Sequence, residues 1–212
     1  MRSTGRILVA ISALCGTLTP VFAQEGITQP GYFEVTGVAD DDVLNVRQFA
    51  SAESEIVGSF GPHAAPIEVL DSEDGWAHVS TGESDGYVST SYLSAVDLPM
   101  LGQSGLPQSL VCAGTEPFWS LRFNENEMLM QDMAEDPQVY VITETRTLGN
   151  VGTYASYVIG GKDSQAAVAI VSNRICSDGM SDRSYSREIA LLFLGSGGTA
   201  SYSGCCFVPM NP

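Results

Sequence analysis

Four cysteines in the second half of the chain are the clearest candidates for residues that form covalent bonds or bind a metal. They are Cys112, Cys176, Cys205 and Cys206, and the last two are adjacent. Four cysteines can form two disulfide bonds, which allows three pairings, or they can hold zinc or copper. A bond between adjacent cysteines strains the backbone. We therefore expect Cys205 and Cys206 each to bond one of the other two, in an order that the sequence leaves open, and we expect no metal site.

A second group of residues combines carboxylates with a cation and aromatic rings. Residues 115–119 read Thr-Glu-Pro-Phe-Trp, and residues 178–185 read Asp-Gly-Met-Ser-Asp-Arg-Ser-Tyr. Glycine permits a positive φ and aspartate caps backbone N–H groups, so the second stretch is typical of an elaborate turn. The same residue types could instead form a binding site, or an acid and a base for glycosidic hydrolysis. The candidate residues for such a site are Glu116, Trp119, Asp178, Asp182, Arg183 and Tyr185.

Other enzyme signatures are missing from the sequence. His63 and His78 are the only histidines, so a serine or cysteine nucleophile in the second half has no histidine near it in sequence to activate it. The sequence contains no phosphate loop, no nucleotide fingerprint and no His-Glu-x-x-His motif. We therefore expect a protein that is not an enzyme, with no catalytic residue and no cofactor.

The amino-terminal residues read as a secretory signal. Arg2 and Arg6 precede an apolar run at 7–18, which is too short to span a bilayer, and small residues end at Ala23. We expect cleavage after Ala23, export to the periplasm and no membrane span. Loss of two arginines takes the formal charge from −16 to −18. Such acidity excludes nucleic acid and anionic lipid as partners, and it suits solubility or a cationic protein partner.

The rest of the chain divides into two β-rich domains. We expect a signal peptide at 1–23, a small barrel at 31–96, a glycine- and proline-rich linker at 97–108 and a larger domain at 109–212. The predicted fold class is all-β, with the small barrel followed by a disulfide-linked barrel or sandwich. Residues 166–171 and 189–194 are continuously apolar, which predicts central strands covered on both faces.

The first domain resembles the bacterial SH3-like family over about 35–95. The resemblance rests on Val-Leu-Asn-Val-Arg at 43–47, Ile-Glu-Val-Leu at 67–70, Asp-Gly-Trp-Ala-His-Val at 74–79 and Gly-Tyr-Val-Ser at 86–89. It implies a five- or six-stranded barrel that binds cell-wall peptides or other envelope components, without catalysis. Trp76 and Tyr87 are candidate ligand contacts, although core packing is the simpler interpretation of Trp76. Asn45, Arg47 and Phe49 are further candidates for the lining of a groove.

The second domain resembles a family of exported bacterial domains described only as uncharacterised. The resemblance covers about 110–207 and rests on the motifs at 112–119, at 176–185 and at Gly-Cys-Cys, 204–206. At the level of fold alone, that family is similar to small periplasmic β-barrels of the heat-shock lipoprotein and lysozyme-inhibitor kind. The resemblance implies an architecture and no activity.

Together these features predict a periplasmic, non-catalytic binding or adaptor protein of the cell envelope, whose SH3-like domain recognises a wall peptide or an envelope protein. One alternative is an inhibitor of a cationic wall-degrading enzyme, because an acidic rigid barrel complements a basic protein. The other alternative is a hydrolase that uses the carboxylates.

Overall fold

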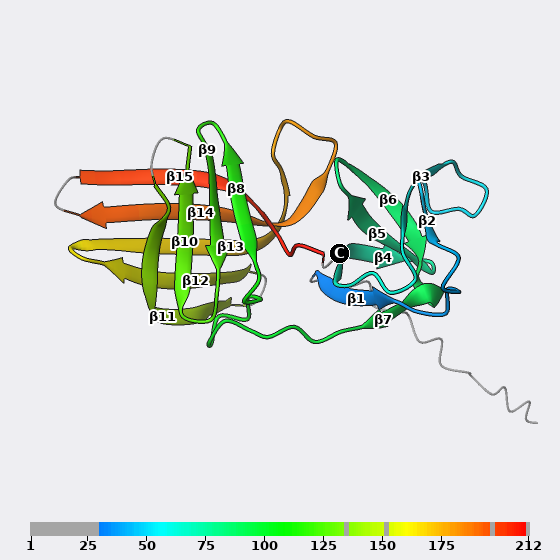
Figure 1. Cartoon of the computed structure of the whole chain (residues 1–212), viewed down its shortest axis with the longest axis horizontal. Coiled ribbons are helices and arrows are strands. Elements are labelled where there is room, and N and C mark those ends of the chain that lie inside the picture. The colour runs from blue at the N-terminus through cyan, green and yellow to red at the C-terminus, as the bar shows by residue number, and fades with distance from the viewer. Residues whose placement is uncertain (1–29, 134–135, 151–152, 196–197, 211–212) are drawn as a thin grey trace, which may run out of the picture.

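The structure, a computed structural model, describes residues 30–133, 136–150, 153–195 and 198–210; the predicted signal peptide at 1–23 lies outside these ranges. Within them, strands β1 to β15 and one short 3₁₀ helix, η1 (Thr90–Tyr92), form two units (Figure 1). The predicted all-β fold class is therefore confirmed. Among the described residues, no helix is long and apolar enough to cross a membrane.

The first unit is an SH3-like antiparallel sheet in the order β3-β2-β6-β5-β4-β1-β7. Alternate residues of its strands point inward, and Val46, Val69, Val79 and Val88 are fully buried in its small core. Its strands are β1 (Gly31–Val35), β2 (Leu44–Arg47), β3 (Ile56–Phe60), β4 (Ile67–Glu73), β5 (Trp76–Thr81), β6 (Ser84–Ser89) and β7 (Leu93–Ala95).

The second unit is a closed eight-stranded barrel in which each strand pairs with the next along the chain and β15 returns to β8. The sequence left a barrel and a sandwich open, and the structure has the barrel. Its strands are β8 (Val111–Thr115), β9 (Phe118–Phe123), β10 (Glu127–Asp132), β11 (Gln138–Asn150), β12 (Thr153–Lys162), β13 (Gln165–Ser177), β14 (Ser184–Gly195) and β15 (Gly198–Phe207).

The two continuously apolar stretches lie in β13 and β14, but they are covered on one face only. Ala169, Val171 and Leu191 point into the barrel, whereas Ile170 and Leu192 are 41% and 42% exposed on its outer face. The prediction that both faces are covered is therefore wrong. A strand of a closed barrel has one interior face, and in the described residues no further layer covers the outer face of these two strands.

Trp119 fills one side of the barrel core and explains two glycines of the motifs. Its ring packs edge-on against Tyr202. A Cβ atom at Gly114 would collide with the indole, and one at Gly204 would collide with the carbonyl group of Ala113 and crowd the same ring. Both positions therefore need glycine, because the ring and the backbones of β8 and β15 approach each other closely.

Two disulfide bonds cross-link strands of this barrel, and each uses one of the adjacent cysteines, as predicted. Cys112 bonds Cys206 between β8 and β15, where both residues are fully buried in the interior. Cys176 bonds Cys205, so the end of β13 is tied across β14 to β15. The pairing that the sequence left open is thereby determined.

The segment at 97–108 folds against the barrel. Leu101 and Leu106 are buried in the barrel core, and Ser104 is buried beside them. The backbone of this segment bonds β11, because the Gln103 N–H donates to Thr145 Oγ1 at 2.8 Å and Thr147 Oγ1 donates to the Ser104 carbonyl at 2.9 Å. These contacts close one side of the barrel with chain that reads as a linker in sequence.

Candidate functional site

The end of β13, its loop and the start of β14 (residues 177–187, here the docking segment) lie between the two units (Figure 1). Asp178 organises its turn: its carboxylate accepts hydrogen bonds from the N–H groups of Met180 and Ser181 and from the hydroxyl of Tyr185, at 2.9–3.0 Å. Desolvation raises the pKa of Asp178, but these hydrogen bonds outweigh it and lower the pKa to about 2. Asp178 therefore stabilises the turn through these hydrogen bonds.

The docking segment contacts the first unit through its backbone. The N–H group of Ser184 donates to Asp85 Oδ1 at 2.8 Å, and the Ser184 carbonyl accepts from Ser80 Oγ at 2.6 Å. Asp182 forms an isolated bridge with Ser84 of β6. The motif at 176–185 therefore builds a junction between the units, a role that neither interpretation of the sequence included.

Asp85 is the acceptor at the centre of these contacts. Besides Ser184, it accepts a hydrogen bond from Ser80 Oγ at 3.1 Å and lies 3.1 Å from His78 Nε2. Desolvation raises the pKa of Asp85, but the hydrogen bonds from Ser184 and Ser80 and the adjacent imidazole together hold it below its usual value. The ionised carboxylate is thus the form that the junction favours.

A buried ion pair completes the junction. Arg187 Nη1 of β14 lies 2.9 Å from Glu68 Oε1 of β4, and their side chains are only 5% and 11% exposed. The same nitrogen donates to Tyr32 Oη at 2.7 Å, while Ser186 Oγ donates to Glu68. Burial is the main cause that raises the pKa of Tyr32, and the negative charge of Glu68 raises it further. Tyr32 belongs to the first unit, yet its ring packs in the core cluster of the barrel.

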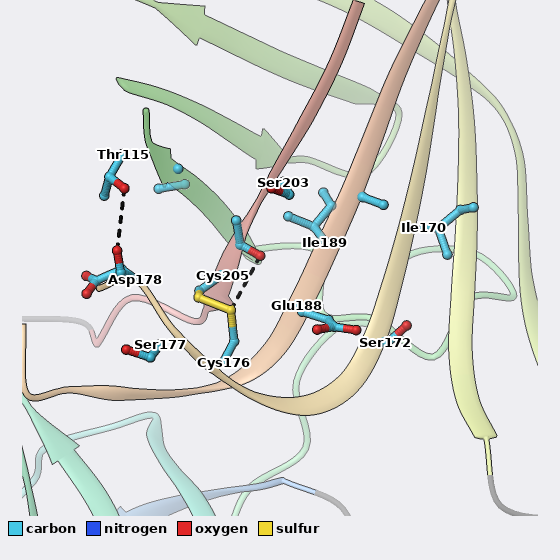
Figure 2. Close-up of a pocket in the computed structure, with 14 residues that line it drawn as sticks. Thr115, Ile170, Ser172, Cys176, Ser177, Asp178, Glu188, Ile189, Ser203 and Cys205 are labelled. Atoms are coloured by element: carbon cyan, nitrogen blue, oxygen red, sulfur yellow. Dashed lines mark hydrogen bonds between the residues drawn. A yellow bond between two sulfur atoms is a disulfide. The ribbon is translucent and has the colours of Figure 1, made fainter. Parts of the chain in front are cut away.

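Beside the docking segment, a pocket of about 490 Å³ opens on the outer face of the barrel, shown in Figure 2. The Cys176–Cys205 bond lies along one side, with Glu188 and Ser172 nearby, and Thr115 Oγ1 donates to the Asp178 carbonyl at 3.4 Å. Glu116 is exposed in the turn between β8 and β9 and forms no ion pair with Arg183. Among the described residues, no group of three or more His, Cys, Asp or Glu side chains could hold a metal ion.

A second candidate binding site is a groove of about 620 Å³ on the first unit. Trp76 begins β5 at its floor, Tyr92 of η1 is 42% exposed at its edge, and Asn45 and Arg47 come from β2. Arg47 Nη1 donates to the Ser54 carbonyl at 2.9 Å, so the guanidinium ties down the loop between β2 and β3. The groove combines aromatic surface with an amide and a cation, which suits an extended peptide.

Two other sequence candidates lie outside the residues that line this groove. Tyr87 stacks on His78, with ring centroids 5.2 Å apart, on the strands that face the junction. Phe49 is 64% exposed in the loop that Arg47 holds. The structure therefore brings Trp76, Asn45 and Arg47 together with Tyr92, which is not among the site residues predicted from the sequence.

Comparison with known proteins supports the identity of the first unit only. Residues 42–94 match the family model described as Bacterial SH3 domain, a stretch that runs from β2 into β7. Domains of this family are generally binding modules. No curated protein matches the chain, and no solved structure does. No family model matches residues 110–207, so their resemblance to an uncharacterised exported family stays a prediction.

Sequence reasoning did not single out Arg187 or Glu68. A signal for Arg187 was present, because Arg187 shares the period-2 alternation of Ile189 and Leu191 and so had to point into the barrel. A buried arginine requires a partner. Nothing in the sequence identified that partner as Glu68, which lies 119 residues away.

Proposed function

We propose that the chain is a periplasmic, non-catalytic binding protein of the cell envelope, and that the groove of its SH3-like unit holds a short peptide of the cell wall. The observation that carries this proposal is the groove itself, in a unit that matches the bacterial SH3 family. Its volume of about 620 Å³ lies in the ordinary range for ligand sites and accommodates a few residues of extended peptide.

The groove chemistry supports a peptide ligand. Trp76 and Tyr92 offer rigid aromatic surface that costs little conformational entropy on binding. Asn45 can both donate to and accept from a peptide backbone, and Asp42 adds a carboxylate at the rim. The two disulfide bonds of the barrel fit an oxidising compartment outside the cytosol, which supports export.

The test is retention of the processed chain, residues 24–212, on purified cell-wall sacculi, followed by competition with soluble wall peptides. Changing Tyr92, an exposed aromatic of the groove, to Ser should weaken retention by about tenfold or more, the loss expected of an interface anchor. Tyr157→Ser is the matched control, because Tyr157 lies on β12 of the barrel, away from the groove.

Two outcomes contradict the proposal. The first is no retention of the unaltered chain on sacculi. The second is equal retention of the Tyr92 and Tyr157 variants, which would place any wall contact outside the groove. Circular dichroism and thermal unfolding of both variants establish that each is folded before its binding is compared.

A further inference from the structure

A second, smaller pocket of about 220 Å³ lies where the two units meet. Phe60 and Ile67 of the first unit form one apolar wall, and Val208 and Met210, which follow β15, form the other. Arg183 of the docking segment is the cation that lines it. We call this site the junction pocket, and none of its lining residues belongs to the peptide groove.

Two aromatic rings contact the guanidinium of Arg183. Its Cζ atom lies 4.6 Å from the ring centroid of Tyr185 and 4.6 Å from that of Phe207. Stacking on aromatic faces leaves the edge of a guanidinium, which carries its N–H donors, free to meet a planar acceptor. The rings therefore preorganise Arg183 for a ligand at little entropic cost.

The donors of Arg183 are poorly satisfied by the protein. In the part of the chain that the structure describes, the only hydrogen bond of its guanidinium is from Nη1 to the Gly82 carbonyl, at a long 3.5 Å. Its Nε atom is buried and has no hydrogen-bond partner there. A desolvated cationic donor without an acceptor is costly, so this arrangement favours binding of an acceptor from outside.

Three other arginines differ from Arg183 in having a carboxylate partner, whereas Arg47 and Arg122 also form no ion pair among the described residues. Arg187, Arg174 and Arg146 each form an ion pair with a glutamate. Acidic residues outnumber basic ones by 25 to 9, yet no described carboxylate pairs with Arg183. Glu68 also lines the junction pocket, but its charge is balanced by Arg187. Arg183 therefore keeps a positive charge that no carboxylate of the described residues compensates.

We propose that the junction pocket is a carboxylate-binding site, in which Arg183 receives the terminal carboxylate of a peptide and the apolar walls receive its small aliphatic side chain. A guanidinium fork matches a carboxylate in a bidentate manner. The pocket volume of about 220 Å³ is less than half that of the peptide groove, about 620 Å³, so the pocket suits a small terminal residue. The inference does not depend on the peptide groove, and either proposal can fail without the other.

The probes are N-acetylalanine, in both enantiomers, and N-acetylalaninamide, which has nearly the same shape without the negative charge. Each is titrated into ¹⁵N-labelled chain, residues 24–212, at 0.15 M salt, and the Gly82 amide and the Arg183 Nε–H signal are followed by nuclear magnetic resonance. We expect saturable shifts of both signals with N-acetylalanine and none with the amide.

Three variants separate a binding role of Arg183 from a structural one. Arg183→Gln should weaken binding of N-acetylalanine by about tenfold or more. Met210→Glu, at a position that is 46% exposed, should have the same effect by placing a carboxylate at the pocket without touching Arg183. Met133→Glu is the matched control, because Met133 is 81% exposed and does not line the pocket, and it should bind normally.

The proposal is overturned if the unaltered chain shows no saturable shifts, or if acid and amide shift the same signals equally. It is also overturned if Met210→Glu binds as tightly as Met133→Glu. Should Arg183→Gln lose its folded spectrum, the comparison of the two methionine variants alone decides, since neither residue contributes to the docking contacts.

Discussion

Changing Glu68 to Gln should destabilise both units, because it removes one partner of the buried ion pair that joins them. Arg187 would keep its charge in a site where its side chain is 5% exposed. Only the hydroxyls of Tyr32 and Ser186 and a neutral amide would remain as its hydrogen-bond partners there. Leaving one charge of a buried pair uncompensated costs about 3–5 kcal/mol. For a chain of this size about 2–4 °C is lost per kcal/mol, so the midpoint should fall by about 6–20 °C.

The two tryptophans allow each unit to be observed separately. Trp76 lies in the first unit and Trp119 in the barrel, so Trp76→Phe and Trp119→Phe backgrounds each leave one fluorescent reporter. Urea unfolding of Glu68→Gln should be shifted at both reporters, although the substitution lies in the first unit. Glu188→Gln is the control, because its partner Arg174 is 71% exposed and a surface pair contributes only about 0–1 kcal/mol.

A double-mutant cycle with Arg187→Met makes the test specific to the contact. Residues in one hydrogen-bonded network show coupling energies of about 0.5–3 kcal/mol, whereas distant residues are additive within about 0.5 kcal/mol. We expect the double variant to be clearly more stable than the sum of the single losses predicts. Additive losses, or a loss below 1 kcal/mol at Glu68 that the Trp119 reporter does not register, would refute the docking of the two units.

Further predictions concern the barrel and its docking segment. Gly204→Ala should cost about 1–3 kcal/mol by overpacking against the carbonyl group of Ala113 and, less severely, against Trp119, as measured by urea unfolding. Replacing Cys176 and Cys205 by Ala should cost about 3–4 kcal/mol for a separation of 29 residues, and hydrogen exchange at the Ser184 amide should accelerate. Asp178, with its pKa lowered to about 2, contributes stability that is full above about pH 4 and lost as pH falls towards 2. The stability gap between the unaltered chain and Asp178→Asn should therefore close over that range.

Much of the fold could be predicted from the sequence because strands carry a local signal. The sequence predicts strands in the second domain at 118–123, 128–131, 138–147, 153–159, 166–172, 188–194 and 200–207, and each of these ranges lies within one of the strands β9 to β15. β8 was missed because Val-Cys-Ala-Gly-Thr is short and contains glycine and alanine, which are depleted in strands. The cysteine pairing followed in part from the strain of an adjacent bond, and its order depended on which faces of β15 point inward.

The candidate site was harder to predict because it depends on contacts between distant segments. Trp76, Asn45 and Arg47 were indicated by a family resemblance, and their position in a groove depends on the packing of η1 and two loops around them. Asp178 and Tyr185 do lie together, but as a turn that holds the docking segment. The sequence shows which residues are polar and near one another along the chain, and it does not show which surface they face.

The groove and the junction both involve β5, a placement that fits the binding role proposed above. Trp76 begins β5 in the groove, and Ser80, four residues on, bonds the docking segment at the junction. At about 3.3 Å per residue, these two sites lie on the order of 13 Å apart along one strand. A peptide held in the groove therefore leaves the contacts of Asp85 and Glu68 with the barrel intact. Because those contacts fix the barrel to the first unit, a ligand held by one unit would also fix the direction in which the other unit faces.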